Sequence, residues 1–246
     1  MTRPRSPSSG REIAGAGAPQ TESELFARAL DLAGSTLGEL GRKLGIAVPQ
    51  ELLRAKGWFG QALELSLGAT AGSRAAPDFE ALGIELKTLP VGRKGVPCES
   101  TFVCTIDLSR IGDVDWPASL VRKKLSRVLW VPVEGAREIP VPERRIGTPL
   151  LWSPSPEEEQ ALRFDWEELA GIIGRGDVEN ITGHLGRHLQ IRPKAASSRS
   201  RRRGVDGDGA SFAALPRGFY LRATFTAALL AERFGLPASA LARDHQ

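Results

Sequence analysis

Hydrophobic residues in the first part of the chain recur at intervals of three and four, which is typical of amphipathic helices. In two places a threonine is followed three residues later by a glutamate, and these capping boxes predict helices within residues 21–34 and 36–45. A third helix is expected from Pro49 to a break at Lys56–Gly57, because glycine disfavours helix, and a fourth over residues 58–67.

Strand patterns follow in the middle of the chain. Apolar and charged residues alternate in GIELKTLPV, residues 83–91, so Glu85 and Lys87 leave the same face of the predicted strand. The run CESTFVCTIDL, residues 98–108, is expected to form the neighbouring strand. RVLWVPVEG is apolar without interruption and predicts a buried strand, whereas residues 121–127 before it fit either a helix or a loop.

The second half of the chain mixes turn-rich segments with one strong helix. A proline-rich segment, residues 139–156, is expected to cross the surface. Ser155, a following proline and three glutamates predict the start of a helix that ends at Gly174. Residues 195–213 are of low complexity and predict a mobile loop. The remaining predictions are strands within residues 188–194 and 218–222 and a last helix over residues 225–234.

The composition is that of a globular protein. The 246 residues are 41% hydrophobic and 25% charged, which excludes a fibrous or disordered chain. Two cysteines cannot form a disulfide framework or a four-ligand zinc site. No apolar run approaches the roughly 18 residues of a membrane helix. We therefore expect a cytoplasmic protein with a disordered tail over residues 1–19, one domain over residues 20–235 and a tail over residues 236–246.

Basic residues are unevenly distributed along the chain. Residues 191–222 contain eight basic and two acidic side chains, although the whole chain has a net charge of only +4. Such a stripe indicates a polyanion partner, and a solvated charged surface is the alternative. A second basic cluster consists of Arg122, Lys123, Lys124 and Arg127.

The segment PDFEALGIELKT, residues 77–88, carries side chains suited to phosphodiester hydrolysis. Asp78 precedes the predicted strand, and Glu85 and Lys87 lie two apart on it. Two carboxylates suit a hard cation such as Mg²⁺, and a lysine beside that cation can act on the attacking water. This is the Asp…Glu-x-Lys pattern of restriction-endonuclease-like nucleases. An edge strand with a solvated Glu–Lys face is the alternative.

The sequence around this motif resembles the MutH family of methyl-directed mismatch-repair endonucleases. The resemblance implies an α/β fold with a restriction-endonuclease-like core and two lobes flanking a DNA cleft. Type II restriction enzymes that cut at GATC share part of the pattern. The matching blocks occur in the order of the family over residues 21–235: KGWFGQALELSLGATAGSRAAPDFEALGIELKTLPV, ESTFVC, VRKKLSRVLWVPVEG, PLLWSP, DWEEL, LQIRPKAA and LPRGFYL.

The resemblance implies a catalytic set of five residues. Asp78 and Glu85 would bind Mg²⁺, and Lys87 would act near the attacking water. Glu64 and Lys124 match two further active-site positions of the family. A solvated helix position is the alternative for the glutamate, and a solvated basic turn is the alternative for the second lysine.

The resemblance also implies five DNA-binding residues. Lys56 matches a phosphate contact and Phe102 an aromatic residue near the DNA. Arg192, Pro193 and Tyr220 match residues that recognise bases. Arginine suits guanine, whose O6 and N7 it can contact together, and a tyrosine against adenine N6 could exclude a methyl group. Core packing of the two aromatic rings, and surface or phosphate contacts for the arginine, are the alternatives.

The function implied by the resemblance is Mg²⁺-dependent nicking of the unmethylated strand 5′ to the G of hemimethylated GATC. MutL, activated by MutS at a mismatch, would stimulate a monomeric enzyme. A GATC-specific restriction endonuclease is one alternative, although a chain of this length has no second homologous domain. A non-catalytic DNA-binding module is the other, and the intact set of acidic and lysine residues argues against it.

Overall fold

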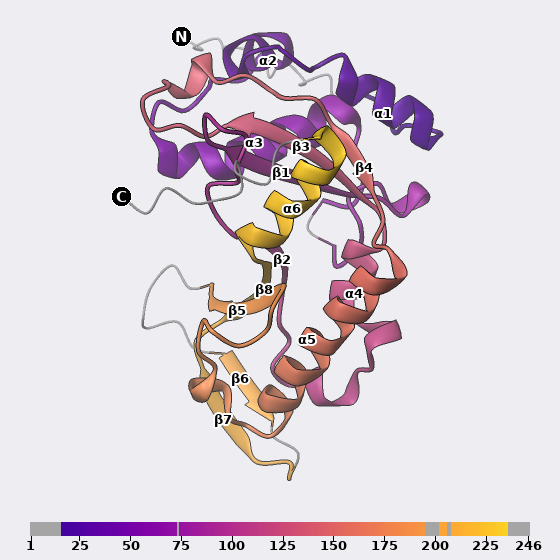
Figure 1. Cartoon of the computed structure of the whole chain (residues 1–246), viewed down its shortest axis with the longest axis vertical. Helices are drawn as coiled ribbons and strands as arrows, with labels where there is room; N and C mark the ends of the chain where they lie inside the picture. The colour runs from indigo at the N-terminus through magenta and orange to yellow at the C-terminus, as the bar shows by residue number, and fades with distance from the viewer. Residues whose placement is uncertain (1–15, 73, 195–201, 206–207, 236–246) are drawn as a thin grey trace, which may run out of the picture.

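The structure is a computed structural model that describes residues 16–72, 74–194, 202–205 and 208–235. Its architecture is mixed α/β, with two three-stranded sheets and a two-stranded hairpin (Figure 1). The helices are α1 (Glu22–Leu30), α2 (Leu37–Leu44), α3 (Leu52–Leu67), α4 (Leu120–Leu125), α5 (Pro156–Gly174) and α6 (Ala223–Phe234). The strands are β1 (Glu85–Val91), β2 (Thr101–Thr105), β3 (Val128–Glu134), β4 (Leu150–Trp152), β5 (Leu189–Pro193), β6 (Arg202–Val205), β7 (Ser211–Ala214) and β8 (Arg217–Leu221).

The first two helices begin as predicted. Thr21 accepts a hydrogen bond from the Glu24 N–H at the start of α1. Thr36 and Glu39 form a complete capping box at the start of α2, and Gly45 ends that helix with a φ of 69°. The predicted tail over residues 236–246 and most of the tail over residues 1–19 lie outside the described residues. None of the described helices has the length and apolar character needed to cross a bilayer.

The predicted break at Lys56–Gly57 is wrong, because α3 runs without interruption from Leu52 to Leu67. A glycine inside a helix costs about 1 kcal/mol relative to alanine, but it keeps its N–H donor, so the hydrogen-bond ladder continues. Burial of the apolar face of α3 offsets this cost: Phe59 is 4% exposed, and Leu63 and Leu67 are fully buried.

The predicted buried strand β3 lies at the centre of the first sheet, whose order is β1–β3–β4. β3 pairs in parallel with β1 and antiparallel with β4. The prediction that residues 98–108 neighbour β1 is wrong, since β2 pairs with β8 in the second sheet. β3 takes the central position because its side chains are apolar on both faces. β4 was missed within the proline-rich segment because it is only three residues long.

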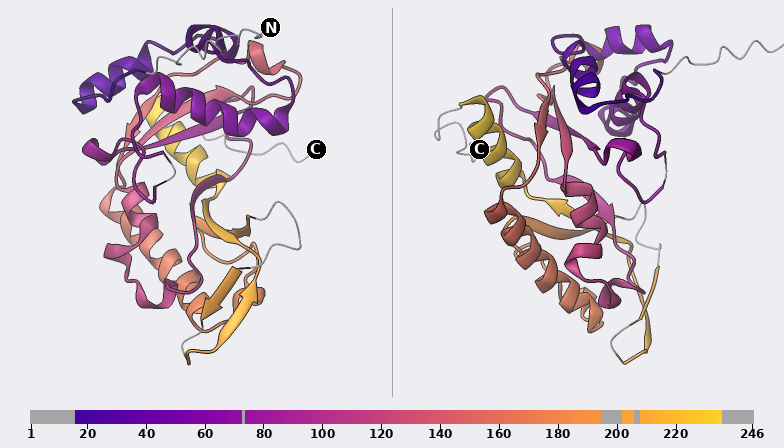
Figure 2. Two further views of the ribbon diagram at one scale, coloured as in Figure 1. Left: turned by 180° about the vertical axis from the view of Figure 1, so that it is seen from behind. Right: turned by 90° about the vertical axis from the view of Figure 1, so that its right-hand side faces the viewer.

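Helices α1, α2 and α3 lie on one side of the first sheet and α6 on the other (Figure 2), and each side has its own hydrophobic cluster. Leu129 and Val131 of β3 pack into the cluster that also contains apolar residues of α1, α2 and α3. Val128 and Trp130 pack into the other cluster with apolar residues of α5, α6 and the second sheet. The alternating side chains of one strand therefore join both cores.

The second sheet has the order β2–β8–β5, with both outer strands antiparallel to β8. The predicted strands within residues 188–194 and 218–222 are thus confirmed and are direct neighbours. Their register places Phe102, Tyr220 and Gln190 in one row across the sheet. Gly218 leaves room for the aromatic ring on β2, because a Cβ atom there would lie 2.9 Å from the Phe102 ring.

Part of the segment predicted as a mobile loop forms the hairpin of β6 and β7. The two strands pair antiparallel, with Arg202 opposite Ala214 and Val205 opposite Ser211. The intervening sequence DGDGA contains Asp-Gly pairs, which are typical of hairpin turns, a signal that the arginine- and glycine-rich composition obscured. Residues 195–201 and 206–207 of that segment lie outside the described residues.

The carboxylate of Asp165 joins α5 to the second sheet. Asp165 is 3% exposed and lies on the apolar face of the helix. Its two oxygens accept backbone N–H groups of Arg187, His188 and Leu189 at 2.9, 2.5 and 2.8 Å. These bonds fix the chain at the point where it enters β5.

We expect Asp165→Ala to lower the free energy of unfolding by about 3 kcal/mol, because three backbone donors lose a charged acceptor. Asp165→Asn keeps one oxygen and should lose less. Glu168→Ala, at an exposed position of the same helix, is the matched control. Urea denaturation measures all three variants, and an unchanged midpoint for Asp165→Ala would contradict this anchoring role.

Candidate active site

The three residues of the predicted motif come together at the start of β1. Asp78 lies in the turn before the strand, and its Oδ2 accepts the Leu86 N–H at 2.8 Å. Glu85 is 1% exposed, and its Oε1 lies 2.5 Å from the Nζ of Lys87 on the same strand face. β1 is an edge strand, as the alternative interpretation required. The solvated glutamate of that interpretation is wrong, because Glu85 is buried.

Lys124 reaches the same carboxylate from α4. The segment that fitted a helix or a loop is a helix, and the Lys124 Nζ lies 2.9 Å from both Glu85 oxygens. Its alternative interpretation as a solvated basic turn is therefore wrong. Two ammonium groups thus pair with one buried carboxylate. A buried charge is tolerated only when it has such partners.

Glu64 of α3 belongs to the same electrostatic cluster. Burial raises the pKa of Glu64, and the negative charges of Asp78 and Glu85 raise it further. Burial and the charge of Glu85 likewise raise the pKa of Asp78, against the opposing Leu86 hydrogen bond. Negative charge is therefore in excess beside the paired Glu85.

The donor chemistry of this cluster fits a hard divalent cation. Asp78 and Glu85 offer carboxylate oxygens, and a cation would relieve the repulsion that raises the pKa of Asp78. Within the described residues, no three Asp, Glu, His or Cys side chains gather closely enough to hold a metal alone. Water and substrate phosphate would have to complete the coordination, as is usual for Mg²⁺.

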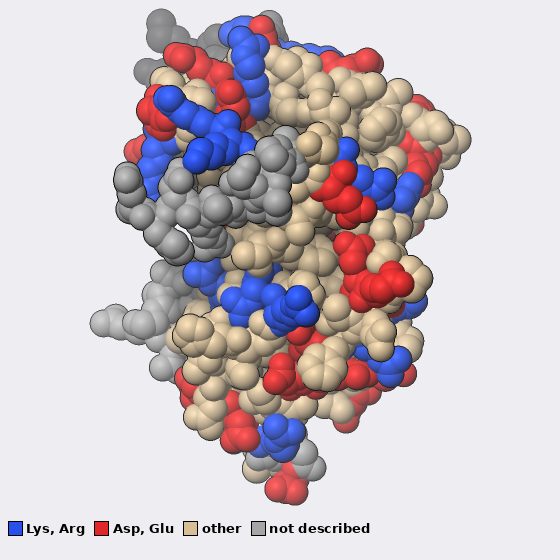
Figure 3. Space-filling model, in the orientation of Figure 1, with Lys and Arg blue, Asp and Glu red and all other residues tan. Residues whose placement is uncertain are grey.

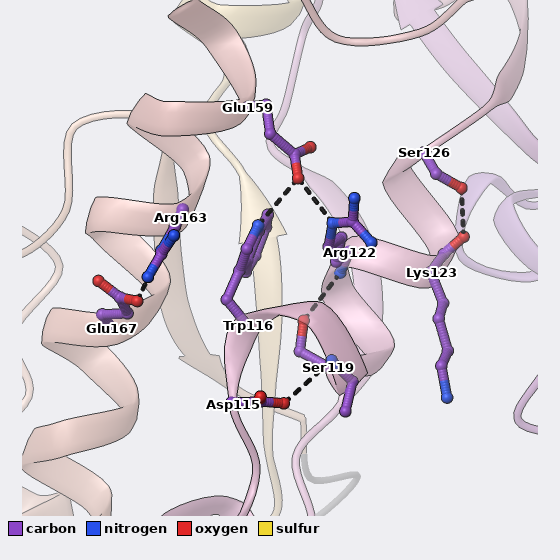
Figure 4. A network of polar contacts seen from close by, with 10 residues as sticks. Asp115, Trp116, Ser119, Arg122, Lys123, Ser126, Glu159, Arg163 and Glu167 are labelled. Atoms are coloured by element: carbon purple, nitrogen blue, oxygen red, sulfur yellow. Dashed lines mark hydrogen bonds and ion pairs between the residues drawn. The ribbon is translucent and has the colours of Figure 1, made fainter. Parts of the chain in front are cut away.

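A polar network holds α4, and with it Lys124, against α5 (Figure 4). Ser119 caps α4 by accepting the Arg122 N–H at 3.1 Å. The Oε1 of Glu159 on α5 accepts the Trp116 Nε1–H at 2.9 Å and the Arg122 Nε–H at 2.7 Å. One carboxylate thus joins α5 to the turn before α4 and to α4 itself.

Three of the predicted recognition residues, Phe102, Tyr220 and Arg192, lie together on the second sheet. The Phe102 and Tyr220 rings meet edge to face with centroids 5.3 Å apart, and the guanidinium carbon of Arg192 lies 6.0 Å from the Tyr220 centroid. Both aromatic residues are half-buried, whereas Arg192 and Pro193 are exposed. A cavity of about 740 Å³ opens beside β5 and is lined by Arg192, Pro193 and Gln190 among others. Pro193 is tolerated because β5 is an edge strand.

The predicted basic stripe is wrong at two positions. Arg217 is 6% exposed and pairs with Glu179 at 3.2 Å. Arg222 donates to the carbonyl oxygens of Gly183 and Gly186. On the face that Figure 3 shows, Lys and Arg alternate with Asp and Glu and do not form one band. Lys56 lies on α3, and its side chain is outside the described part of the structure.

Comparisons with known proteins agree with the resemblance. A family model described as "DNA mismatch repair enzyme MutH" matches residues 67–165, which contain the acidic and lysine motif. The chain is 53% identical over 216 residues to proteins named "DNA mismatch repair protein MutH" from Klebsiella pneumoniae and Escherichia coli. Each alignment covers 88% of this chain and 94% of the relative.

The chain belongs to the MutH family. This membership confirms the predicted resemblance and accounts for the mixed α/β architecture. The MutH-family motif residues Asp78, Glu85 and Lys87 and the additional Lys124 are adjacent in space.

Three residues that support this MutH-family site were missed. Asp165 lies among apolar residues on the buried face of α5, and an isolated acid there was a detectable signal. Glu159 looked like one of three interchangeable acids in the first turn. Lys194 belongs to the basic stripe and lies two residues after Arg192, so their shared strand face was a detectable signal.

We expect Glu159→Ala to lower the free energy of unfolding by about 1–2 kcal/mol, because the buried Trp116 indole loses its acceptor. Glu159→Gln keeps an acceptor and should remain near wild type. Glu167→Ala is the control, since the exposed pair of Glu167 with Arg163, also drawn in Figure 4, should contribute less than about 0.5 kcal/mol. Equal losses for Glu159→Ala and Glu167→Ala would contradict the importance of this network.

Proposed function

We propose that this chain is a Mg²⁺-dependent DNA endonuclease that nicks the unmethylated strand 5′ to the G of hemimethylated GATC during mismatch repair. The observation that carries this proposal is the convergence of Lys87 and Lys124 on the buried Glu85, beside Asp78 and Glu64. Membership of the MutH family supports the reaction class. We propose MutL, with MutS acting through it, as the stimulating partner of a monomeric enzyme.

Asp78 and Glu85 would hold the Mg²⁺ ion. When bound, such an ion polarises the scissile phosphate and lowers the pKa of an attacking water. Lys87, which lies within hydrogen-bond distance of Glu85, would orient that water and stabilise charge on the phosphate. Lys124 holds the Glu85 carboxylate from its other side.

The charge balance of the cluster favours binding of the Mg²⁺ ion no later than binding of the DNA. Three carboxylates, Glu64, Asp78 and Glu85, face the two ammonium groups that pair with Glu85, so these five ionised side chains together have an excess of one negative charge. A bound divalent cation would change this net charge from negative to positive, so the site would attract the negative charge of a phosphodiester. Electrostatics therefore supports metal binding before or together with DNA.

Recognition would come from the second sheet. We propose that the two sheets with their helices form two lobes that flank a DNA cleft. Arg192 would contact guanine, Tyr220 would lie against adenine N6, and Pro193 and Phe102 would pack against the DNA. Lys56 on α3 would bind a phosphate. Because Arg192 and Tyr220 are adjacent, the two side chains could contact neighbouring bases at the same time, which supports this proposal.

One assay tests the proposed function as a whole. The protein and Mg²⁺ are incubated with unmethylated, hemimethylated and fully methylated GATC duplexes, each with and without MutL. We expect nicking of unmethylated strands only, and faster nicking with MutL. Cutting of both strands at once would favour a restriction endonuclease, and binding without cleavage would favour a non-catalytic module.

We expect Lys87→Met to reduce the nicking rate by at least about 100-fold while DNA binding persists, because it removes a group that acts in the chemical step. Lys43→Met, at an exposed position of α2, is the control and should nick normally. Single-turnover nicking measures the chemical step, and an unchanged rate for Lys87→Met would exclude this role.

Tyr220→Ser should relax discrimination against methylated strands, because a smaller side chain leaves room for the methyl group. Arg192→Ala should instead weaken selection of GATC by roughly 1–3 kcal/mol, since a two-point contact to guanine is lost. Nicking of all three methylation states separates the two effects. Rejection of methylated strands by Tyr220→Ser as strong as in wild type would assign the methyl sensor to another residue.

A further inference from the structure

Lys194 extends from the end of β5 across the second sheet to β2. Its backbone N–H donates to the Pro216 carbonyl oxygen at 2.7 Å and so continues the pairing of β5 with β8. Its Nζ donates to the Thr105 hydroxyl at 3.2 Å and lies 3.6 Å from the centroid of the Phe102 ring. This short distance is typical of a cation–π contact.

Two ammonium groups from different sheets lie within 6.0 Å of the Phe102 ring centroid. The Lys87 Nζ on β1 is 6.0 Å from the ring centroid, and the Lys194 Nζ is 3.6 Å from it. The two lysines differ in their partners. Lys87 is paired with the Glu85 carboxylate, whereas Lys194 contacts a neutral ring and a neutral hydroxyl.

The third ammonium group raises the positive charge of this region. Burial lowers the pKa of Lys194, and the positive charges of Lys87 and Lys124 lower it further. Lys194 therefore lies close enough to the catalytic lysines for their charges to act on it. A cation held here on neutral contacts gains most from an anion that arrives from outside the chain.

We propose that Lys194 binds a phosphate of the DNA backbone next to the phosphate that is cut, and that Phe102 holds its ammonium group in place for this contact. The inference rests on the proposed function, because the phosphate belongs to the DNA substrate of that site. It adds one contact to the DNA substrate. This contact comes from the end of β5, the strand that carries Arg192, and lies on the side that faces β1.

The direction of the side chain favours a phosphate over a base edge. The Arg192 guanidinium lies over the Tyr220 ring, whereas the Lys194 ammonium crosses to Phe102 and Thr105, on the side of Lys87. The absence of a side chain at Gly218 lets the Phe102 ring lie across β8 and meet this ammonium. Lys194 thus faces the reacting phosphate, and Arg192 the recognition surface.

The test compares Lys194→Met, Lys194→Arg and the control Lys43→Met with wild type. Methionine keeps an unbranched stem against Phe102 but removes the charge. Fluorescence anisotropy measures binding to a hemimethylated GATC duplex and to a scrambled duplex, at salt from about 50 to about 200 mM. A series of GATC duplexes then carries one neutral methylphosphonate at each phosphate flanking the scissile bond.

We expect Lys194→Met to weaken binding to both duplexes by the same factor. Raising the salt over this range should weaken the binding of wild type by a factor roughly 3-fold larger than that for Lys194→Met. This difference corresponds to the loss of one phosphate contact. One methylphosphonate next to the scissile bond should weaken wild type and leave Lys194→Met unchanged. Lys194→Arg and Lys43→Met should behave as wild type.

Three results would overturn the inference: wild-type affinity and salt dependence for Lys194→Met, a loss confined to the GATC duplex, or no methylphosphonate position specific to Lys194. If Lys194→Met does not fold, acetylation of wild type read by mass spectrometry decides instead. Lys194 must then be protected by either duplex, and unchanged acetylation overturns the inference. Wild type that binds but does not nick GATC refutes the proposed function separately.

Discussion

The structure around the site depends on the burial of one charge. Glu85 is 1% exposed, and a carboxylate in that position is tolerated only when paired. One partner, Lys87, lies on the same strand, so this pair requires no contact between distant parts of the chain. The other, Lys124, is far away in sequence, so α4 must dock beside β1. Glu159 then has to connect α4 to α5, and Asp165 connects α5 to the strand that carries Arg192. A chain of polar contacts thus runs from the acidic centre to β5.

The apolar framework supplies the rigidity that these polar contacts need. β3 contributes alternate side chains to both hydrophobic clusters, so the faces of the first sheet cannot shift independently. β1 pairs with β3 along its whole length, from Glu85 opposite Val128 to Val91 opposite Glu134. The strand that bears the acidic and lysine residues is therefore an edge strand whose one paired side is attached to the most buried element of the molecule. An open edge beside a fixed backbone is a suitable place for a large substrate.

Features determined by neighbours in sequence were predictable. The helix starts at Thr21 and Thr36 follow from capping chemistry, and the shared face of Glu85 and Lys87 follows from strand alternation. Features decided by distant residues were not. The glycine at position 57 predicts a break, but tertiary burial of α3 overrides it. The pairing of β2 with β8, and the contact of Lys124 with Glu85, depend on which apolar surfaces meet after the chain has folded. Family resemblance supplied the long-range part of the site that residue patterns alone did not.

The order of strands in the second sheet determines when that sheet can be completed during synthesis. β8 lies between β2 and β5, although β2 and β5 are both made earlier. The row that joins Phe102, Tyr220 and Gln190 therefore cannot form until residues 217–221 have left the ribosome. Domains generally fold as their segments emerge, at about 5–20 residues per second. The residues of the acidic and lysine cluster, up to Lys124, are all made before β8, so they precede the strand that completes this row. In a MutH-family chain of this topology, the last strand to be made therefore completes the sheet by taking its central place.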